Sequence, residues 1–143
     1  MTSQGPQVNG LDARQWISAG YACHLYGGKL RAWIAPVYEQ REDISAPVKG
    51  ISDGTAVGFR YLQFGNHTPE TVTVKMTAAV PVTVRVRLDA RDGKEIASFR
   101  AEEGTHEITA PVSGAGIGKH AVYFVFEAEG DGPAAEMDRF TFD

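Results

Sequence analysis

A chain of 143 residues with 43% hydrophobic and 22% charged residues is long enough for one hydrophobic core, so we expect a single globular domain. It has no stretch near the ~20 consecutive apolar residues of a membrane helix, and its N-terminus lacks the pattern of a signal peptide. Its net charge of −4, with both signs mixed, argues against nucleic acid as a partner, and its single cysteine, Cys23, excludes a disulfide within the chain.

The N-terminal part of the chain shows little regular patterning. Residues 1–10 are rich in Gln, Gly, Pro, Ser and Asn, and we expect a poorly packed lead-in there, followed by one module over residues 11–143. The stretch from Leu11 to Ile17 is short enough that it predicts either a helical turn or two or an irregular segment.

Two aromatic residues lie in a polar, turn-rich stretch that runs on to Gly54. Trp33 and Tyr38 are expected to be at least partly exposed there. The apolar C–H faces of sugar rings stack on such side chains, so both residues are candidate platforms for a sugar. The alternative is that they are ordinary core residues, since Trp33 has apolar neighbours on both sides.

From residue 57 onward, alternation of apolar and polar residues predicts β-strands. In the segment 82–88, valines and a leucine alternate with Thr83, Arg85 and Arg87. The same pattern places these groups on inward faces: Val57, Phe59 and Tyr61; Val72, Val74 and Met76; Val122, Phe124 and Phe126; Phe140 and Phe142. We expect Phe59, Phe124, Phe126 and Phe140 in the core.

The strands are short and are separated by turn signals such as Asp53-Gly54 and Asp92-Gly93. The thirteen valines against five leucines also favour strands, because β-branched side chains pack well on a pleated surface. Roughly eight short strands at regular spacing predict an all-β fold, an antiparallel β-sandwich of the jelly-roll type.

Signals for catalysis are weak. The sequence has no nucleophile elbow, HExxH motif or phosphate-binding glycine loop. Glu102, Glu103, Glu136 and Asp138 are the carboxylates that could pair to cleave a glycosidic bond, but adjacent glutamates before a glycine are typical of a solvated turn. The four histidines, at positions 24, 67, 106 and 120, are scattered in the sequence, and a shared metal site would require the fold to gather them. We therefore expect a protein that is not an enzyme.

Four segments, in order along the chain, resemble family 6 carbohydrate-binding modules. They are GISDGTAVGFRYLQFG (50–65), RVRLDARDG (85–93), GKHAVYFVF (118–126) and MDRFTF (137–142). Modules of this kind often lie at the C-terminal end of family 43 glycoside hydrolases. The resemblance implies a jelly-roll β-sandwich that holds polysaccharide near a catalytic domain, usually with a sugar between two aromatic residues and fixed by an asparagine.

The resemblance places the first aromatic residue at Gly50, the second near Glu103 and the asparagine at Glu136. None of these positions holds the expected residue. The resemblance therefore implies that any binding departs from the usual cleft. It also implies a structural calcium ion, but the two N-terminal glutamates that would bind it correspond to Ser18 and Gly20. That leaves Asp138 as the one matching ligand, and the expectation is a partial site that binds calcium weakly.

The sequence thus predicts a non-catalytic module that binds xylan or arabinoxylan. Trp33 and Tyr38 would stack on the sugar, and Glu103, His106 and Glu136 would form hydrogen bonds with it. The alternative is a structural domain that packs on the catalytic domain of a parent hydrolase and has no sugar affinity of its own. A small independent glycosidase, with two facing carboxylates, is a third possibility. Neither nucleic acid nor a membrane is an expected partner, and the compartment is extracellular if the parent enzyme is secreted.

Overall fold

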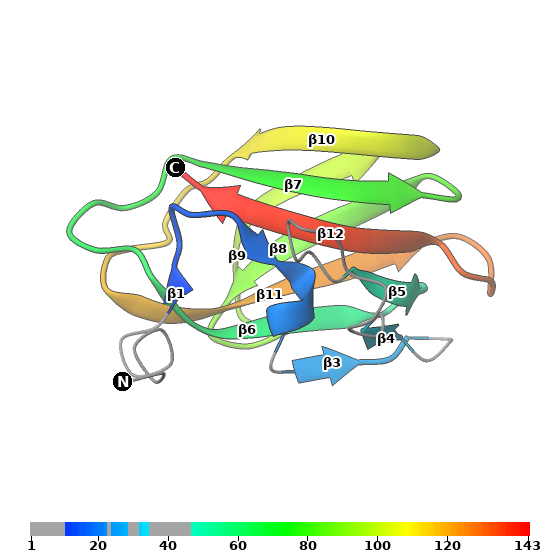
Figure 1. Ribbon diagram of the computed structural model, residues 1–143, viewed down its shortest axis with the longest axis horizontal. Helices are drawn as coiled ribbons and strands as arrows, with labels where there is room; N and C mark the ends of the chain where they lie inside the picture. The colour runs from blue at the N-terminus through cyan, green and yellow to red at the C-terminus, as the bar shows by residue number, and fades with distance from the viewer. Residues whose placement is uncertain (1–10, 23, 29–31, 35–46) are drawn as a thin grey trace.

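The computed structural model of the protein describes residues 11–22, 24–28, 32–34 and 47–143. Within these ranges the chain forms two β-sheets that face each other (Figure 1). The strands are β1 (Leu11–Asp12), β2 (Ile17–Ser18), β3 (His24–Tyr26), β4 (Trp33–Ile34), β5 (Val48–Ile51), β6 (Ala56–Gln63), β7 (Thr71–Ala78), β8 (Val82–Leu88), β9 (Lys94–Ala101), β10 (Gly104–Pro111), β11 (Lys119–Ala128) and β12 (Ala135–Phe142), with one 3-10 turn, η1 (Ala19–Tyr21). The all-β sandwich expected from the sequence is confirmed.

Sheet A has the order β1-β6-β11-β8-β9, and β3 pairs with β6 beside β1. Sheet B has the order β10-β7-β12-β5-β4, and β2 pairs with β12. Neighbouring strands are antiparallel, except that β1 runs parallel to β6. In the part of the chain that the structure describes, no helix is long and apolar enough to cross a membrane.

The N-terminal segment contributes two short strands rather than a helix. Between β1 and β2 the chain makes a turn in which the Gln15 N–H donates to the carbonyl of Asp12. The irregular alternative for Leu11 to Ile17 is therefore the one that forms. The expected lead-in, residues 1–10, lies outside the described residues.

The core lies between the two sheets and is rich in phenylalanine. Phe59, Phe124, Phe126 and Phe140 are fully buried, as the alternation predicts. The Phe140 ring of sheet B lies 4.7 Å from Phe59 and 4.8 Å from Phe124 of sheet A, measured between ring centroids. Aromatic contacts therefore join the two sheets directly.

The prediction that Tyr61 faces inward with Val57 and Phe59 is wrong. Strict alternation along β6 breaks where its register with β11 shifts, so that Arg60 and Tyr61 stand opposite the single residue Ala121. Such a β-bulge shifts the alternation by one residue, so that the side chains after it lie on the faces opposite to those that strict alternation predicts. Tyr61 is consequently 43% exposed, and Leu62 is buried in its place.

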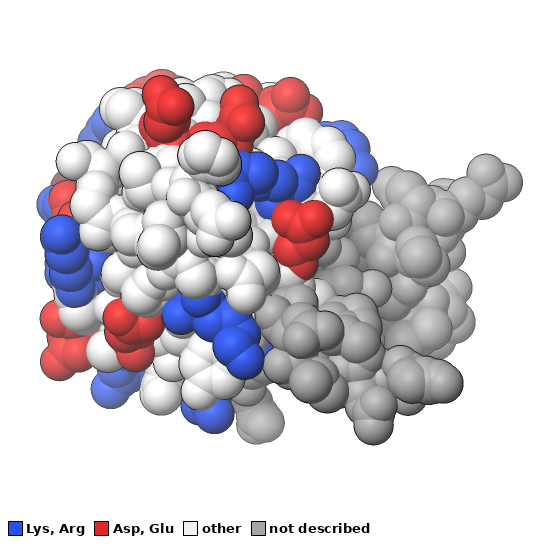
Figure 2. Space-filling model, turned by 90° about the vertical axis from the view of Figure 1, so that its left-hand side faces the viewer, with Lys and Arg blue, Asp and Glu red and all other residues white. Residues whose placement is uncertain are grey.

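Charged side chains of both signs are interspersed over the end of the sandwich that Figure 2 shows. No broad field of one sign covers that end, in keeping with the mixed charge of the sequence. Recognition by charge at this end would therefore have to be local.

Candidate functional site

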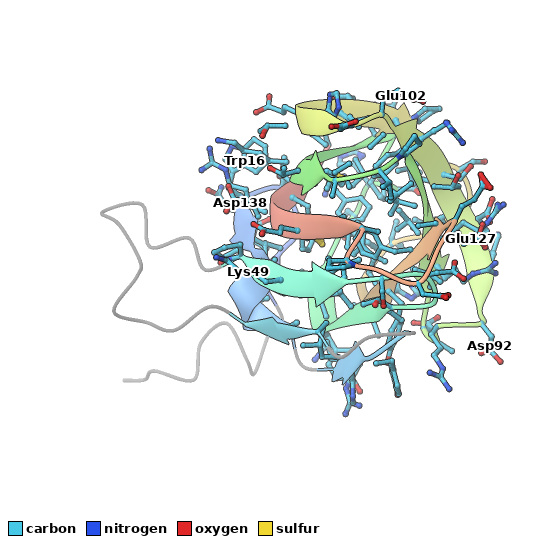
Figure 3. The ribbon with its side chains drawn as sticks, turned by 90° about the vertical axis from the view of Figure 1, so that its right-hand side faces the viewer. Trp16, Lys49, Asp92, Glu102, Glu127 and Asp138 are labelled. Carbon is cyan, nitrogen blue, oxygen red and sulfur yellow. The ribbon has the colours of Figure 1, made fainter. Side chains whose placement is uncertain are left out.

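Two of the residues predicted to have a role, Glu136 and Asp138, belong to β12 in sheet B. Asp138 points away from the sandwich, as Figure 3 shows, and Glu136 is exposed. Both line an open depression of about 240 Å³. The other described residues that line it are Pro47, Lys75, Met76, Thr77 and Thr105. Carboxylates accept hydrogen bonds, and the lysine and threonines donate them, so this depression offers suitable partners for sugar hydroxyls.

Glu103 and His106 lie at the β10 side of sheet B. Glu103 is exposed in the bend before β10, two residues from Thr105. His106 faces the opposite side of sheet B from Thr105, because successive side chains of a strand alternate, and its Nε2 lies 2.7 Å from the carbonyl oxygen of Glu102. The structure thus places Glu103 at the same end of the sheet as Glu136 but does not bring His106 to that face.

Trp33 and Tyr38, the predicted stacking residues, are only partly accounted for. The backbone of Trp33 pairs with Lys49 of β5, and β5 pairs with β12 around Glu136. The backbones at Trp33 and Glu136 are therefore two strands apart, about 10 Å. Tyr38 lies outside the described residues, as does the side chain of Trp33, and the stacking role of both stays a prediction.

The described residues do not fit a calcium ion at the place that the resemblance implies. The Ser18 hydroxyl accepts the N–H of Gly20 at 3.2 Å, and Gly20 has no side-chain oxygen. Asp138 then supplies the one carboxylate of this set, whereas calcium takes about six to eight oxygen ligands. Within the described ranges no group of three or more His, Cys, Asp or Glu side chains could hold a metal ion.

A second surface lies on the outward face of sheet A. It carries the rings of His24, Tyr26, Tyr61 and Tyr123, and we call it the tyrosine face. The His24 ring centroid lies 6.2 Å from that of Tyr26, with 13° between the ring planes, and 6.1 Å from that of Tyr123. Tyr26 and Tyr61 are 36% and 43% exposed. Exposed phenol rings are the kind of group on which the C–H face of a sugar packs, and the described residues that line the sheet B depression include none.

Strand register explains why these rings meet. His24 of β3 and Tyr123 of β11 both stand opposite Gly58 of β6, one on each side. Because Gly58 has no side chain, the rings of its two neighbours can approach each other above it. The tyrosine face is thus built on a gap in the middle of β6.

Cationic groups lie at both exposed tyrosine rings. The Arg91 guanidinium carbon, from the β8–β9 turn, lies 4.2 Å from the centroid of the Tyr26 ring. The Arg60 guanidinium carbon and the Lys119 Nζ lie 5.4 Å and 5.7 Å from the centroid of the Tyr61 ring. These distances are within the range of cation–π attraction.

Farther along the same face, arginines are paired with carboxylates. Arg85 Nη1 lies 3.1 Å from Glu95 Oε1, and Arg85 Nε lies 3.0 Å from Glu127 Oε2. Hydrogen bonds to Glu95 and then to Glu127 raise the pKa of Arg85 above its ordinary value. Arg87 Nη2 lies 3.8 Å from Glu95 Oε1. The carboxylates of this network are therefore paired with Arg85 and Arg87, and Arg87 stands opposite Tyr123 of the tyrosine face in the register of β8 and β11.

The tyrosine face was not found from the sequence because its residues come from separate strands. Two local signals do point to it. His24 and Tyr26 are spaced as residues on one face of a strand, and Gly58 sits inside an alternating pattern, where an isolated glycine marks a bulge or a close approach. Neither signal identifies the partners across the sheet.

Comparison with solved structures finds the same fold in carbohydrate-binding proteins. A family 43 arabinoxylan arabinofuranohydrolase from Bacillus subtilis, solved with cellotetraose, is 23% identical with a TM-score of 0.77, over 92% of this chain and 27% of that chain. A family 6 module from Clostridium cellulolyticum, in complex with xylose, is 20% identical with a TM-score of 0.75, over 92% and 98%. A CBM36 module in complex with calcium and xylotriose is 13% identical with a TM-score of 0.63, over 90% and 99%. This chain thus spans about a quarter of the hydrolase chain that it resembles.

A comparison with curated protein sequences gives no match. The profile of the family described as Carbohydrate binding module (family 6), by contrast, matches residues 37–143, which include β5 to β12. The matched part contains most of the core of both sheets, and it includes Tyr61 and Tyr123 of the tyrosine face but not His24 and Tyr26. The two-sheet architecture and this match over most of the sequence show that the chain belongs to family 6 of the carbohydrate-binding modules, which are non-catalytic.

Proposed function

We propose that this module binds xylan or arabinoxylan chains on its tyrosine face, as an accessory module of a hemicellulose-degrading enzyme. The observation that carries the proposal is the pair of exposed phenol rings, Tyr26 and Tyr61, on one face of sheet A. Sugar binding needs an exposed ring for stacking and polar groups beside it, and His24, Arg60 and Lys119 supply the latter.

The choice of a xylan-type ligand draws support from proteins of the same fold. The Clostridium cellulolyticum module is described with xylose, the CBM36 module with xylotriose, and the Bacillus subtilis enzyme as acting on arabinoxylan. Because the sequence identities are low, these ligands are starting points for a binding experiment on this chain.

The residues predicted from the sequence define a rival site on sheet B. Glu136 lines the depression there, Glu103 lies at the same end of the sheet, and the predicted platforms are Trp33 and Tyr38. The sheet B depression and the tyrosine face lie on different sheets, so we expect mutations in one to leave the other intact.

Affinity electrophoresis in gels that contain soluble arabinoxylan separates the two sites. We expect Y26A/Y61A to lose retardation, since removal of stacking costs about 1–3 kcal/mol per ring if base stacking is a fair guide. We expect W33A/Y38A to keep it if the tyrosine face is the site. Trp16→Ala, which removes another exposed aromatic ring, is the matched control.

Full retardation of Y26A/Y61A would remove the tyrosine face from the site, and loss in W33A/Y38A would assign binding to sheet B. Each variant is compared with the unmodified chain by far-UV circular dichroism, so that unfolding is recognised. A gel without polysaccharide corrects for changes in charge and shape.

The second candidate function is a structural domain without sugar affinity. One observation favours it: the positions of the usual sugar contacts hold Gly50, Glu136 and a residue near Glu103. It predicts no retardation by any polysaccharide, and loss of activity on soluble substrates when the module is deleted from its parent enzyme. Retardation by arabinoxylan would exclude it.

A further inference from the structure

We infer that the tyrosine face prefers polysaccharides that carry carboxylate groups, namely chains with uronate residues, over neutral chains of the same backbone. This inference rests on the proposed function, because it names the class of polysaccharide that the same face selects. It is carried by the positive groups at both exposed tyrosines.

Arg91 is the central group. Its guanidinium carbon lies 4.2 Å from the centroid of the exposed Tyr26 ring. Among the residues that the structure describes, no ion pair joins Arg91 to a carboxylate, its neighbour Asp92 included. The charge of Arg91 therefore lies over the ring of Tyr26, and no carboxylate of the described residues pairs with it.

Arg60 and Lys119 place positive charge at the other exposed ring, Tyr61. Arg60 Nη1 also lies 2.9 Å from His24 Nε2, and the His24 ring stacks on Tyr26. A continuous line of contacts therefore runs from Tyr61 through Arg60 and His24 to Tyr26. A ligand that lies along this line meets aromatic rings and cations in alternation.

A uronate residue matches this arrangement chemically. Its ring has an apolar C–H face that packs on a phenol ring, and its carboxylate accepts hydrogen bonds from a guanidinium. Arginine is suited to this role, because its planar fork of N–H donors matches the two carboxylate oxygens. A neutral pentose offers the stacking face but leaves the arginines with hydroxyl groups alone.

The basic character is local to this face. The whole chain carries a net charge of −4, so general attraction to polyanions is not expected. On the same sheet, Glu95 and Glu127 are bound by Arg85, and Asp89 Oδ1 lies 3.3 Å from His120 Nδ1. These carboxylates are held by other partners.

The test compares glucuronoxylan with the same polymer after chemical reduction of its carboxyl groups to alcohols. The backbone is unchanged, so the difference in retardation measures the contribution of the carboxylates. We expect the native polymer to bind about tenfold more tightly, the usual effect of a hydrogen bond between charged groups. Raising the ionic strength from about 0.01 M to about 0.15 M should narrow the difference, because the Debye length falls from about 30 Å to about 8 Å.

Variants assign the effect to the face. Arg91→Gln should remove most of the preference, because it should weaken binding to the native polymer about tenfold more than binding to the reduced polymer. The control is Arg100→Gln, which removes another exposed arginine from sheet A, one whose Nε lies 2.8 Å from Glu102 Oε2. This control should keep the full preference.

The outcomes separate the inference from the proposed function. Equal binding of the native and reduced polymers, or an unchanged preference in Arg91→Gln, would overturn the inference and leave xylan binding in place. Absence of binding to both polymers would overturn the two together. Competition by single-stranded DNA as strong as that by glucuronoxylan would show that the face responds to charge without sugar stacking, and this also would overturn the inference.

Discussion

The ring of Tyr123 occupies the space in which a side chain at Gly58 would begin. A Cβ atom at position 58 would lie 2.4 Å from Tyr123 Cε2 and 3.2 Å from His24 Cβ. Real Cβ atoms essentially never approach another atom to 2.4 Å, and a contact of 3.2 Å is itself tight. The absence of a side chain at one residue of β6 is therefore what allows Tyr123 and His24 to meet above it.

Gly58→Ala should consequently destabilise the module and displace the tyrosine face. Overpacking of this kind typically costs about 1–3 kcal/mol in the free energy of unfolding. Urea denaturation followed by circular dichroism measures this cost, and arabinoxylan gels measure the loss of binding. The control is Gly132→Ala, since a Cβ at Gly132 meets no heavy atom within 4 Å. A Gly58→Ala protein as stable as this control would contradict the packing described above.

Phe140 joins the two sheets, and its truncation should be among the most damaging substitutions in the core. Its ring contacts Phe59 and Phe124 of the opposite sheet and Phe142 of its own. Replacing a buried phenylalanine by alanine costs about 3–5 kcal/mol. Urea unfolding of Phe140→Ala should show a loss of this size. Phe99→Ala, at a half-buried position, is the comparison and should cost less; equal costs would argue against a core centred on Phe140.

Trp16 should contribute to stability and not to binding. It is 44% exposed on the outward side of sheet B, near Asp138 in Figure 3, and the Arg139 guanidinium carbon lies 4.7 Å from its ring. An exposed cation–π contact is worth about 0.5–1 kcal/mol. Trp16→Ala should lose about that much in urea and bind arabinoxylan as before. A large loss of binding would instead move the site to sheet B.

Calcium should not raise the melting temperature. A ligand present at about 100 times its Kd stabilises a protein by about 2.7 kcal/mol, which is readily detected in a melting curve. Because no group of three or more His, Cys, Asp or Glu side chains among the described residues could hold a metal ion, we expect the same melting temperature with calcium and with EDTA. A rise that depends on calcium concentration, and that Asp138→Asn abolishes, would show that a site exists.

The sequence predicts the long strands well because their alternation is strict. Val82, Val84 and Val86 are almost fully buried, and so are Val122 and Phe124 on the neighbouring strand. In these strands the two-residue period and the burial pattern coincide, so the residues of the core can be read from the sequence. The pairing of β8 with β11 cannot be read from the sequence in this way, because no local pattern specifies which strands become neighbours.

The site was harder to predict for a related reason. Glu136 and Asp138 are close in sequence and share a depression, whereas His106 is turned to the other side of its strand by a single step of alternation. Strict alternation predicts the wrong face for Tyr61, because the extra residue in β6 has no signature in the composition of the strand. Contacts across a sheet, which create the tyrosine face, depend on register, and register is a property of the folded sheet.

The extra residue at Arg60 and Tyr61 also determines how this surface can change. Deleting one position between Phe59 and Leu62 would restore the regular alternation with both of these residues still facing the core, and it would leave one outward residue where there are now two. A lineage of such modules can therefore gain or lose an exposed tyrosine through a one-codon insertion or deletion. The valines and phenylalanines that hold the sheets together need not mutate. The binding specificity can therefore change while the two-sheet fold stays the same.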